Sequence, residues 1–210
     1  MVGMGTEESE STVRAVLFDF GGVLAEEGFR EGLQALAREQ GLEPDQLPRA
    51  GMDAVYDSGF VLGKGTAADF WNLLQRRVGL SGEHQELTER ILDGFVIRPW
   101  MMDVVRGLRA AGCVTGILSD QTHWLDELDK RTPFKQNFDR VYNSYYLGKG
   151  KRDPSLFHDV IEDLGLAAQQ VLFVDDDARN IAHAREQGLQ TIQYRDQDQF
   201  LSALAQRVPH

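Results

Sequence analysis

The chain has 210 residues, of which 42% are hydrophobic, and it carries a net charge of −11 with a pI near 4.9. This length fits one large domain, or a core domain with a smaller insertion, and can bury a core without disulfides or structural metals. A strongly acidic chain repels polyanions, which excludes nucleic acid and anionic membrane surfaces as favoured partners. A small anionic substrate stays open, because a bound cation and one or two lysines can make a pocket locally positive.

The N-terminal residues 1–11 are rich in Gly, Glu and Ser, and have neither a basic start nor an apolar run. A secretory signal needs both features, so we expect a disordered leader here. Cys113 is the only cysteine, and the five histidines have no zinc-site spacing, so disulfides and structural zinc are not expected. No stretch is long and apolar enough to span a bilayer. These features predict a soluble protein of the reducing cytoplasm, and they do not indicate its oligomeric state.

The first predicted element is a short apolar run at residues 14–19, which ends in an aspartate. Continuous apolar runs of this length are typical of strands that are buried on both faces of a parallel sheet. Helical patterns then follow one another without a convincing strand, at Phe29–Ala37, from the Thr66 capping box onward, and at Leu87–Leu92. We interpret residues 26–95 as a helical insertion after the first strand.

Strands and helices alternate after the insertion. A helix is expected from Pro99 to Gly112, and strands at residues 114–119 and 140–143. Asp153 and Pro154 have the pattern of a helix N-cap followed by a proline in the first helical position, and Gly165 closes that segment.

The last predicted elements are a strand at residues 171–176, a helix from Asp177, as its N-cap, to Gly188, and a strand at residues 190–194. This alternation predicts an α/β fold, namely a doubly wound, Rossmann-like parallel sheet with a helical cap inserted after the first strand. The core domain would comprise residues 12–25 and 96–210, and the cap residues 26–95.

Polar residues stand where the three apolar strands end. They are Asp19, Ser119 and the Asp175–Asp176 pair, and Lys151 precedes the predicted helix at Asp153. Ligands of parallel α/β sheets bind at the carboxyl ends of the strands. Two acidic strand ends, a hydroxyl and a lysine therefore predict a shared site.

Four motifs in order resemble the haloacid dehalogenase-like hydrolases, a superfamily dominated by phosphatases. They are Leu17-Phe-Asp-Phe-Gly-Gly-Val-Leu24, Leu118-Ser-Asp-Gln121, the lysine segment 148–154, and the Asp-Asp-x-x-x-Asn variant that ends at Asn180. The insertion falls where this superfamily places its first type of cap. Within the superfamily, the chain resembles sugar-1-phosphate phosphatases and the N-terminal phosphatase domain of epoxide hydrolase.

The resemblance implies a role for each motif residue. Asp19 would be the nucleophile and form an aspartyl-phosphate. Ser119, with the backbone amide of Asp120, would bind a phosphate oxygen, and Lys151 would neutralise the phosphate. Magnesium would be the cofactor, and the substrate a small phosphorylated molecule such as a sugar phosphate. The metal site would comprise Asp19, Asp176 and the Gly21 carbonyl, supported by Asp175 and Asn180.

One position departs from the pattern of most phosphatases in the superfamily, which carry a second aspartate two residues after the nucleophile. Gly21 occupies that position, so the usual general acid/base, a group typically worth about 10²–10⁴-fold in rate, is missing. Three hypotheses follow. The chain is a phosphatase whose acid/base comes from Glu26, Glu27 or the cap, or whose leaving group is good; it is a metal-independent 2-haloacid dehalogenase; or it is a catalytically inactive binding protein.

Several residues have plainer interpretations. Lys149 and Arg152 are the basic neighbours that could be mistaken for Lys151. Trp100 and Trp124 are expected to pack in the core rather than to bind substrate. Lys64 and Arg76 are basic residues within the helical insertion, and we expect them to lie on exposed helix faces.

Overall fold

The computed structural model describes residues 12–208, so the leader predicted for residues 1–11 lies outside the described part. The described residues form a five-stranded sheet in the order β3-β2-β1-β4-β5, and each neighbouring pair is parallel. Its strands are β1 (Ala15–Phe18), β2 (Val114–Ser119), β3 (Arg140–Asn143), β4 (Val171–Asp175) and β5 (Gln190–Gln193). The predicted parallel sheet is confirmed, with every strand end within one residue of its expected place.

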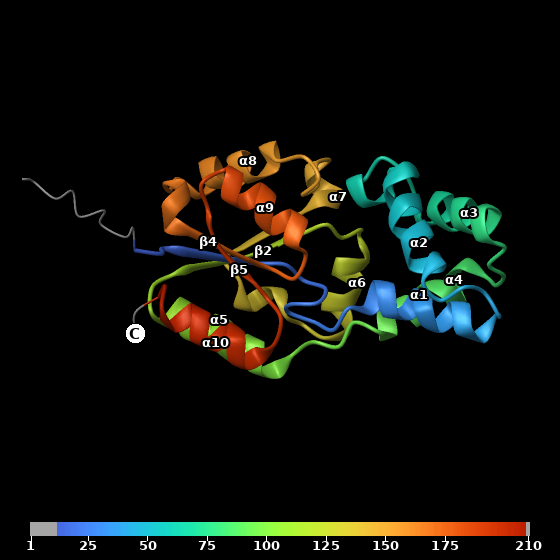
Figure 1. The fold of residues 1–210 in the computed structure, drawn as a ribbon, viewed down its shortest axis with the longest axis horizontal. Coiled ribbons are helices and arrows are strands. Elements are labelled where there is room, and N and C mark those ends of the chain that lie inside the picture. The colour runs from blue at the N-terminus through green and yellow to red at the C-terminus, as the bar shows by residue number, and fades with distance from the viewer. Residues whose placement is uncertain (1–11, 209–210) are drawn as a thin grey trace, which may run out of the picture.

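Helices cover both faces of this sheet (Figure 1). On one face lie α8 (Ser155–Leu164) and α9 (Ala178–Glu186), and on the other lie α5 (Pro99–Ala110) and α10 (Gln197–Ala205). Side chains alternate along β1, so that Leu17 packs toward α8 and α9 while Phe18 packs toward α5 and α10. This is the predicted doubly wound arrangement. The remaining elements near the sheet are α6 (Trp124–Arg131), α7 (Ser144–Leu147) and the 3₁₀ turns η2 (Lys135–Asn137) and η3 (Ala168–Gln170).

Between β1 and β2 the chain forms a helical insertion, a name we keep for residues 28–93. It comprises α1 (Gly28–Glu39), α2 (Gln46–Asp57), η1 (Phe60–Leu62), α3 (Ala67–Val78) and α4 (His84–Asp93). The capping box predicted at Thr66 is present, and Thr66 and Asp69 satisfy each other's backbone N–H groups. The helix α2 was not predicted. It packs so closely on α1 that a Cβ on Gly51 would lie 2.4 Å from Leu33 Cδ1, so a larger residue there would require the Leu33 side chain to shift.

One helix start was predicted too early. Helix α8 begins at Ser155, and Pro154, which was expected in its first helical position, is the N-cap instead. The physical reason is a tight turn that precedes the helix. The Asp153 carboxylate accepts a hydrogen bond from the Ser155 N–H, while the Asp153 carbonyl accepts one from Leu156 N, three residues on. The aspartate therefore caps the turn rather than the α-helix.

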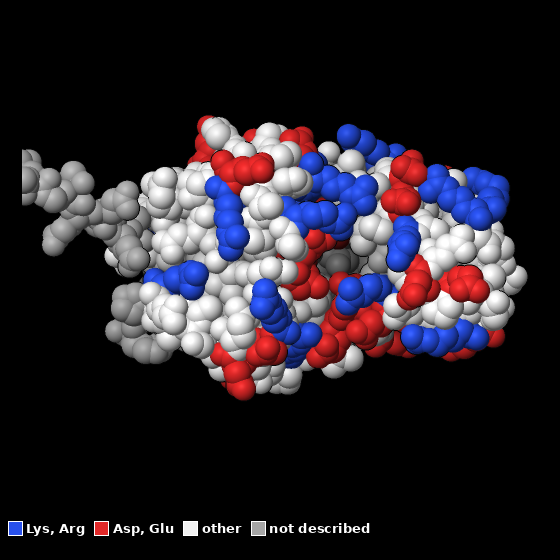
Figure 2. All heavy atoms as spheres, viewed as in Figure 1, with Lys and Arg blue, Asp and Glu red and all other residues white. Residues whose placement is uncertain are grey.

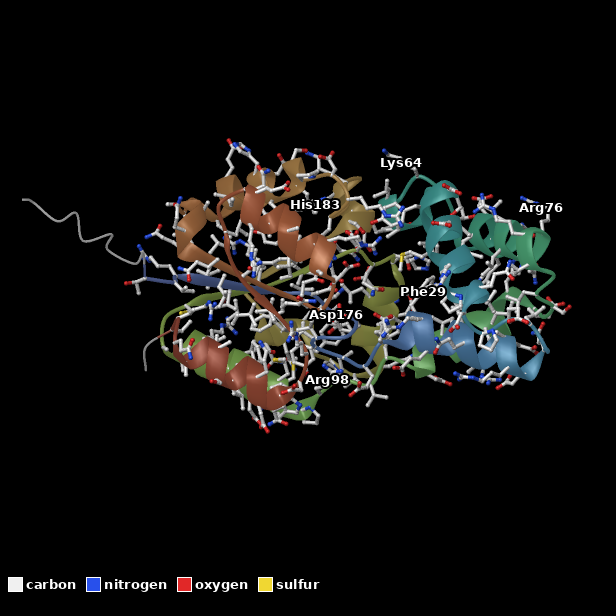
Figure 3. The ribbon with its side chains drawn as sticks, in the orientation of Figure 1. Phe29, Lys64, Arg76, Arg98, Asp176 and His183 are labelled. Atoms are coloured by element: carbon white, nitrogen blue, oxygen red, sulfur yellow. The ribbon has the colours of Figure 1, made fainter. Side chains whose placement is uncertain are left out.

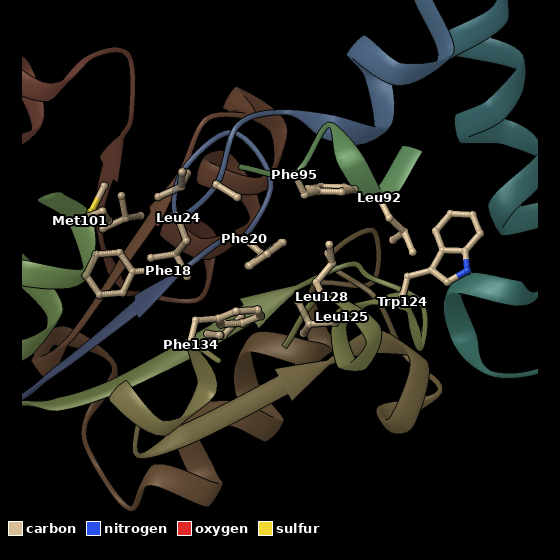
Figure 4. Packing of buried hydrophobic residues seen from close by; sticks show 14 of the residues in the cluster. Phe18, Phe20, Leu24, Leu92, Phe95, Met101, Trp124, Leu125, Leu128 and Phe134 are labelled. Atoms are coloured by element: carbon tan, nitrogen blue, oxygen red, sulfur yellow. The ribbon is translucent and has the colours of Figure 1, made fainter. Parts of the chain in front are cut away.

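Aromatic side chains join the sheet to the helical insertion (Figure 4). Phe20, which follows β1, stacks on Phe134 with ring centroids 5.0 Å apart and also contacts Phe95 at 5.7 Å. Trp124 is 3% exposed and packs against Phe60 at 5.3 Å, as expected, but it also lines the cavity at the carboxyl ends of the strands. Trp100 contacts Phe200 at 6.1 Å.

Within residues 12–208, no helix is long and apolar enough to cross a membrane.

Candidate active site

The carboxyl ends of β1, β2 and β4 bring the first predicted site residues together. Asp19 directly follows β1 and is only 9% exposed. Its Oδ1 accepts hydrogen bonds from Ser119 Oγ at 2.6 Å and from the Phe20 N–H at 2.8 Å. The backbone N–H of Asp19 continues the pairing with β4 through the Val174 carbonyl. The carboxylate is thus held in one orientation by three strands of the sheet.

Lys151 is the cation of this site and is 2% exposed. Its Nζ lies 2.7 Å from Asp175 Oδ2 and 2.9 Å from Asp19 Oδ1. Burial opposes its charge, but the carboxylates of Asp175, Asp19 and Asp120 outweigh burial and raise the pKa of Lys151. Of its basic neighbours, Lys149 pairs with Asp159 at the surface, and the Arg152 guanidinium stacks on a tyrosine. Only Lys151 therefore reaches Asp19.

In this site the carboxylate groups outnumber the single ammonium group, which is that of Lys151. Oxygens of Asp19, Asp175 and Asp176 all lie within 4.8 Å of one another. Burial raises the pKa of Asp175, whereas hydrogen bonds from Lys151, the Asp177 N–H at 2.7 Å and the Asn180 amide at 3.1 Å favour its ionised form. Burial and repulsion by Asp19 also raise the pKa of Asp176. This surplus of hard oxygen ligands fits a divalent cation such as magnesium.

The loop after β1 approaches Asp176 closely. Gly22 has φ +80°, and a Cβ on it would lie 2.6 Å from Asp176 Oδ2. Arg98 holds this loop, because its guanidinium donates to the carbonyls of Gly22 at 2.8 Å and Val23 at 3.1 Å. The second glycine of the Asp-Phe-Gly-Gly motif therefore favours this backbone conformation and lets the Asp176 carboxylate keep its position.

The side chain of Asp120 makes structural contacts, in addition to the phosphate contact predicted for its backbone amide. It accepts hydrogen bonds from the Lys151 N–H at 2.9 Å and from the hydroxyl of Tyr56 in α2. The Arg152 guanidinium stacks on the Tyr56 ring, with its central carbon 3.7 Å from the ring centroid. Asp120 therefore fixes the lysine loop and links it to the helical insertion.

Glu27 is the carboxylate nearest to the position of the missing second aspartate. A Cβ on Gly21 would lie 3.5 Å from Glu27 Oε2. Burial, and to a lesser degree repulsion by Asp176 and Asp19, raises the pKa of Glu27 to about 7. Glu26 differs, because it is exposed and pairs with Arg98 at 2.8 Å, and the hydrogen bond from Arg98 lowers the pKa of Glu26. Only Glu27 of the two candidates faces the site.

A cavity of about 450 Å³ opens over these residues, with lining groups from both the sheet ends and the helical insertion. In Figure 2 acidic side chains lie inside this hollow, and basic side chains surround it. Figure 3 shows Asp176 and His183 on the sheet side and Phe29 on the insertion side, while Lys64 and Arg76 lie apart from the site. Both basic residues are exposed, as expected, but only Arg76 lies on a helix, because Lys64 is in the loop before α3.

The residues of this cavity that the sequence did not predict include Tyr56 and His183. Tyr56 belongs to the unpredicted α2, so no pattern placed it near the site. His183 lies in α9, and its Nδ1 is 3.0 Å from the Lys151 carbonyl oxygen. Its position three residues after Asn180, almost one helical turn, is the only signal that could have placed it on the same face. Asp177 is the N-cap of α9, as predicted, and accepts from the Arg179 N–H.

Two curated relatives align with this chain to different extents. Rat bifunctional epoxide hydrolase 2 is 31% identical over 103 residues, which cover 46% of this chain and 18% of the relative. D-ribitol-5-phosphate phosphatase of Bacteroides thetaiotaomicron is 26% identical over 193 residues, which cover 86% of this chain and 91% of the relative. The chain therefore spans less than a fifth of the first relative but nearly the whole of the second.

Solved structures share the fold. A haloacid dehalogenase family enzyme of B. thetaiotaomicron, in complex with magnesium and inorganic phosphate, matches with a TM-score of 0.64 at 22% identity, covering 87% of this chain and 94% of that one. The L-2-haloacid dehalogenase of Xanthobacter autotrophicus, with chloropropionic acid covalently bound, matches with a TM-score of 0.65 at 18% identity, covering 93% and 83%.

The family model for haloacid dehalogenase-like hydrolases matches residues 13–188. This range includes the first four strands, the helical insertion and every residue of the acidic cluster, which is Asp19, Asp175 and Asp176. The chain therefore belongs to the haloacid dehalogenase-like hydrolases.

Proposed function

We propose that this hydrolase is a magnesium-dependent phosphatase that acts on a small phosphorylated metabolite through an aspartyl-phosphate on Asp19. The observation that carries this proposal is the cluster of Asp19, Asp175 and Asp176, with oxygens within 4.8 Å of one another, around one buried lysine. The whole-length similarity to a sugar-alcohol phosphate phosphatase supports it.

The residues present fit a magnesium ion. Both Asp175 oxygens accept hydrogen bonds from neighbouring donors, whereas Asp176 makes no ion pair within the described residues. We therefore assign Asp19, Asp176 and the Gly21 carbonyl as ligands, with Asp175 and Asn180 in support. The ion would offset phosphate charge in the transition state.

Metal binding also separates this proposal from halide displacement. That reaction needs no cation, and it would leave the carboxylates of Asp19, Asp175 and Asp176 facing one lysine at a net cost. The dehalogenases among the structural neighbours share the fold with this chain at under 25% identity, so they do not favour that chemistry over phosphate transfer.

The chain's own residues account for both halves of the reaction. Asp19 attacks phosphorus, a new P–O bond forms, and the bond to the leaving oxygen breaks. Ser119 and the backbone amide of Asp120 bind a phosphate oxygen, and Lys151 neutralises phosphate charge. Water then attacks phosphorus, which frees inorganic phosphate and restores Asp19.

Glu27 replaces the acid/base that Gly21 lacks. The leaving oxygen needs a proton in the first half of the reaction, and the attacking water loses one in the second. A carboxyl group with a pKa of about 7, beside the site of the missing side chain, is present in both forms at neutral pH. Glu26 and the good-leaving-group alternative are then unnecessary.

The domain boundaries also remain part of the proposal. Residues 12–25 and 96–210 would act as the catalytic core, and residues 26–95 as a cap that closes over the substrate and excludes water. The wall that the helical insertion contributes to the cavity supports this division.

Phosphate release tests the proposal. A panel of sugar phosphates, nucleotides and acyl phosphates is incubated with magnesium or with chelator, for the wild type and for Asp19→Asn. We expect release that needs the metal and falls by about 10⁴-fold or more in the variant, with the native circular dichroism spectrum retained. Metal-independent turnover of 2-chloropropionate would establish the dehalogenase instead, and no turnover of either class would favour a non-catalytic role.

A further inference from the structure

The wall of the cavity that faces away from the sheet comes from the helical insertion, and it differs from the ionic wall opposite. Its apolar members are Phe29, Pro48, Met52, Val55 and Val61. The whole cavity, at about 450 Å³, lies within the range of about 300–1,000 Å³ that small-molecule sites occupy. There is therefore room for a leaving group between the phosphoryl site and this wall.

The polar groups of this wall are few. Glu27 lies over Gly21, and the Tyr56 hydroxyl donates to Asp120, so neither is free to bind the far end of a leaving group. The other two are Arg30 and Arg49. Among the lining residues described, the insertion contributes no Ser, Thr, Asn or Gln side chain, which are the usual partners of a polyol.

Both arginines are exposed, and neither forms an ion pair within 4.0 Å in the described part of the chain. Arg49, Met52 and Tyr56 lie three and four residues apart in α2, which places them on one helix face toward the cavity. Arg152 on the sheet side stacks on Tyr56 at 3.7 Å. Positive groups therefore gather around this opening in a chain of net charge −11 (Figure 2).

We propose that the leaving group carries a second anionic group, a carboxylate or a phosphate, on an apolar body, and that Arg30 and Arg49 bind this group. This inference rests on the proposed phosphatase function. The apolar wall would bury the body of the leaving group, and charge-assisted hydrogen bonds would hold its end. A polyol would find only the two arginines as free polar groups on this wall, and each hydroxyl group buried against the apolar residues without a partner would cost about 1–3 kcal/mol.

Four esters with similar primary alkoxide leaving groups test the proposal: pentyl phosphate, 5-phosphooxypentanoate, pentane-1,5-bisphosphate and ribitol 5-phosphate. We expect kcat/KM with magnesium to be at least roughly tenfold higher for the two esters with a second charge than for the other two. The faster of the pair identifies the second group as carboxylate or phosphate. The advantage should shrink at high salt, because the arginines are exposed.

Variants test the assignment to the arginines. Arg49→Gln and Arg30→Gln should each reduce the ratio of kcat/KM between the faster of the two doubly charged esters and pentyl phosphate by several-fold. Arg76→Gln, an exposed arginine of α3 that does not line the cavity, should leave that ratio unchanged. Hydrolysis of all four esters at equal kcat/KM, or fastest hydrolysis of the ribitol ester, would overturn the second anionic subsite while the phosphatase stands. Hydrolysis of none would overturn the proposed function itself.

Discussion

The two walls of the active-site cavity are built by different means. On the sheet side, four polar residues are each at most 9% exposed, and each makes a hydrogen bond with a group at a strand end. They are Asp19, Ser119, Lys151 and Asp175. On the insertion side the polar groups are Tyr56, two exposed arginines and, at the edge, Glu27, and the rest of the wall is apolar. Buried, hydrogen-bonded groups keep one geometry, whereas exposed side chains on helices can change without loss of the fold. The sheet side is thus suited to a fixed reaction and the insertion side to a variable leaving group.

Removal of Lys151 should disrupt the sheet side most strongly. Lys151→Met leaves the carboxylates of Asp19 and Asp175 buried without their cation, which we expect to cost about 3–5 kcal/mol of unfolding free energy. Urea unfolding in the presence of chelator measures this loss. Lys149→Met, which removes an exposed pair with Asp159, should cost less than about 1 kcal/mol.

The loss in Lys151→Met should depend on pH with a definite sign. Burial raises the pKa of Asp175, and removal of the lysine takes away its strongest opposing charge. A carboxyl group whose pKa is raised in the folded state favours folding at low pH, and this contribution is lost as pH rises through that raised pKa. The variant should therefore be closer to wild type at pH 5 than at pH 8. An equal deficit at both values would contradict the role of the buried carboxylates.

Glu27 lies on the boundary between the two walls, and its substitution tests whether chemistry stays on the sheet side. Glu27→Gln keeps an acceptor for the Arg30 N–H at 3.2 Å but cannot transfer a proton. We expect kcat/KM, which reports the reaction up to loss of the leaving group, to fall by about 10²-fold on alkyl phosphates and by much less on p-nitrophenyl phosphate, whose leaving group needs no acid. The pH profile should also lose a transition near 7.

Glu26→Gln is the matched control, since Glu26 is the neighbouring carboxylate but pairs with Arg98 outside the cavity. Its kcat/KM should stay close to that of the wild type on both esters. If Glu27→Gln lowered kcat/KM on the alkyl and p-nitrophenyl esters by the same factor, Glu27 would be a helix cap that shapes the site rather than the acid that protonates the leaving oxygen.

The sequence predicted the sheet side far better than the insertion side. Asp19, Ser119 and Asp175 stand at the ends of apolar runs, so the period of the strands and the parallel topology place them together. Tyr56 and Arg49 lie in α2, whose Pro48 and Gly51 obscure a helical pattern. Their positions near Asp120 and the cavity depend on how the helices pack on one another, which periodicity does not encode. The burial of Glu27 depends on the same packing.

The smallest predicted effect concerns the loop that lets Asp176 approach the sheet side. Gly22→Ala and Gly41→Ala both place a Cβ on a residue with positive φ, +80° and +66°, so each should cost about 1–2 kcal/mol of stability. Only the Cβ on Gly22 would meet a neighbour, Asp176 Oδ2 at 2.6 Å, since Gly41 has nothing within 4 Å. A side-chain carboxylate can turn away from such a contact at little cost in stability, but it then leaves the position of a metal ligand. Gly22→Ala should therefore need several-fold more magnesium for half-maximal phosphate release, while Gly41→Ala should not. An equal magnesium requirement in the two variants would show that the carboxylate of Asp176 is not held for the metal, and would remove one of the features that distinguish the fixed wall from the variable one.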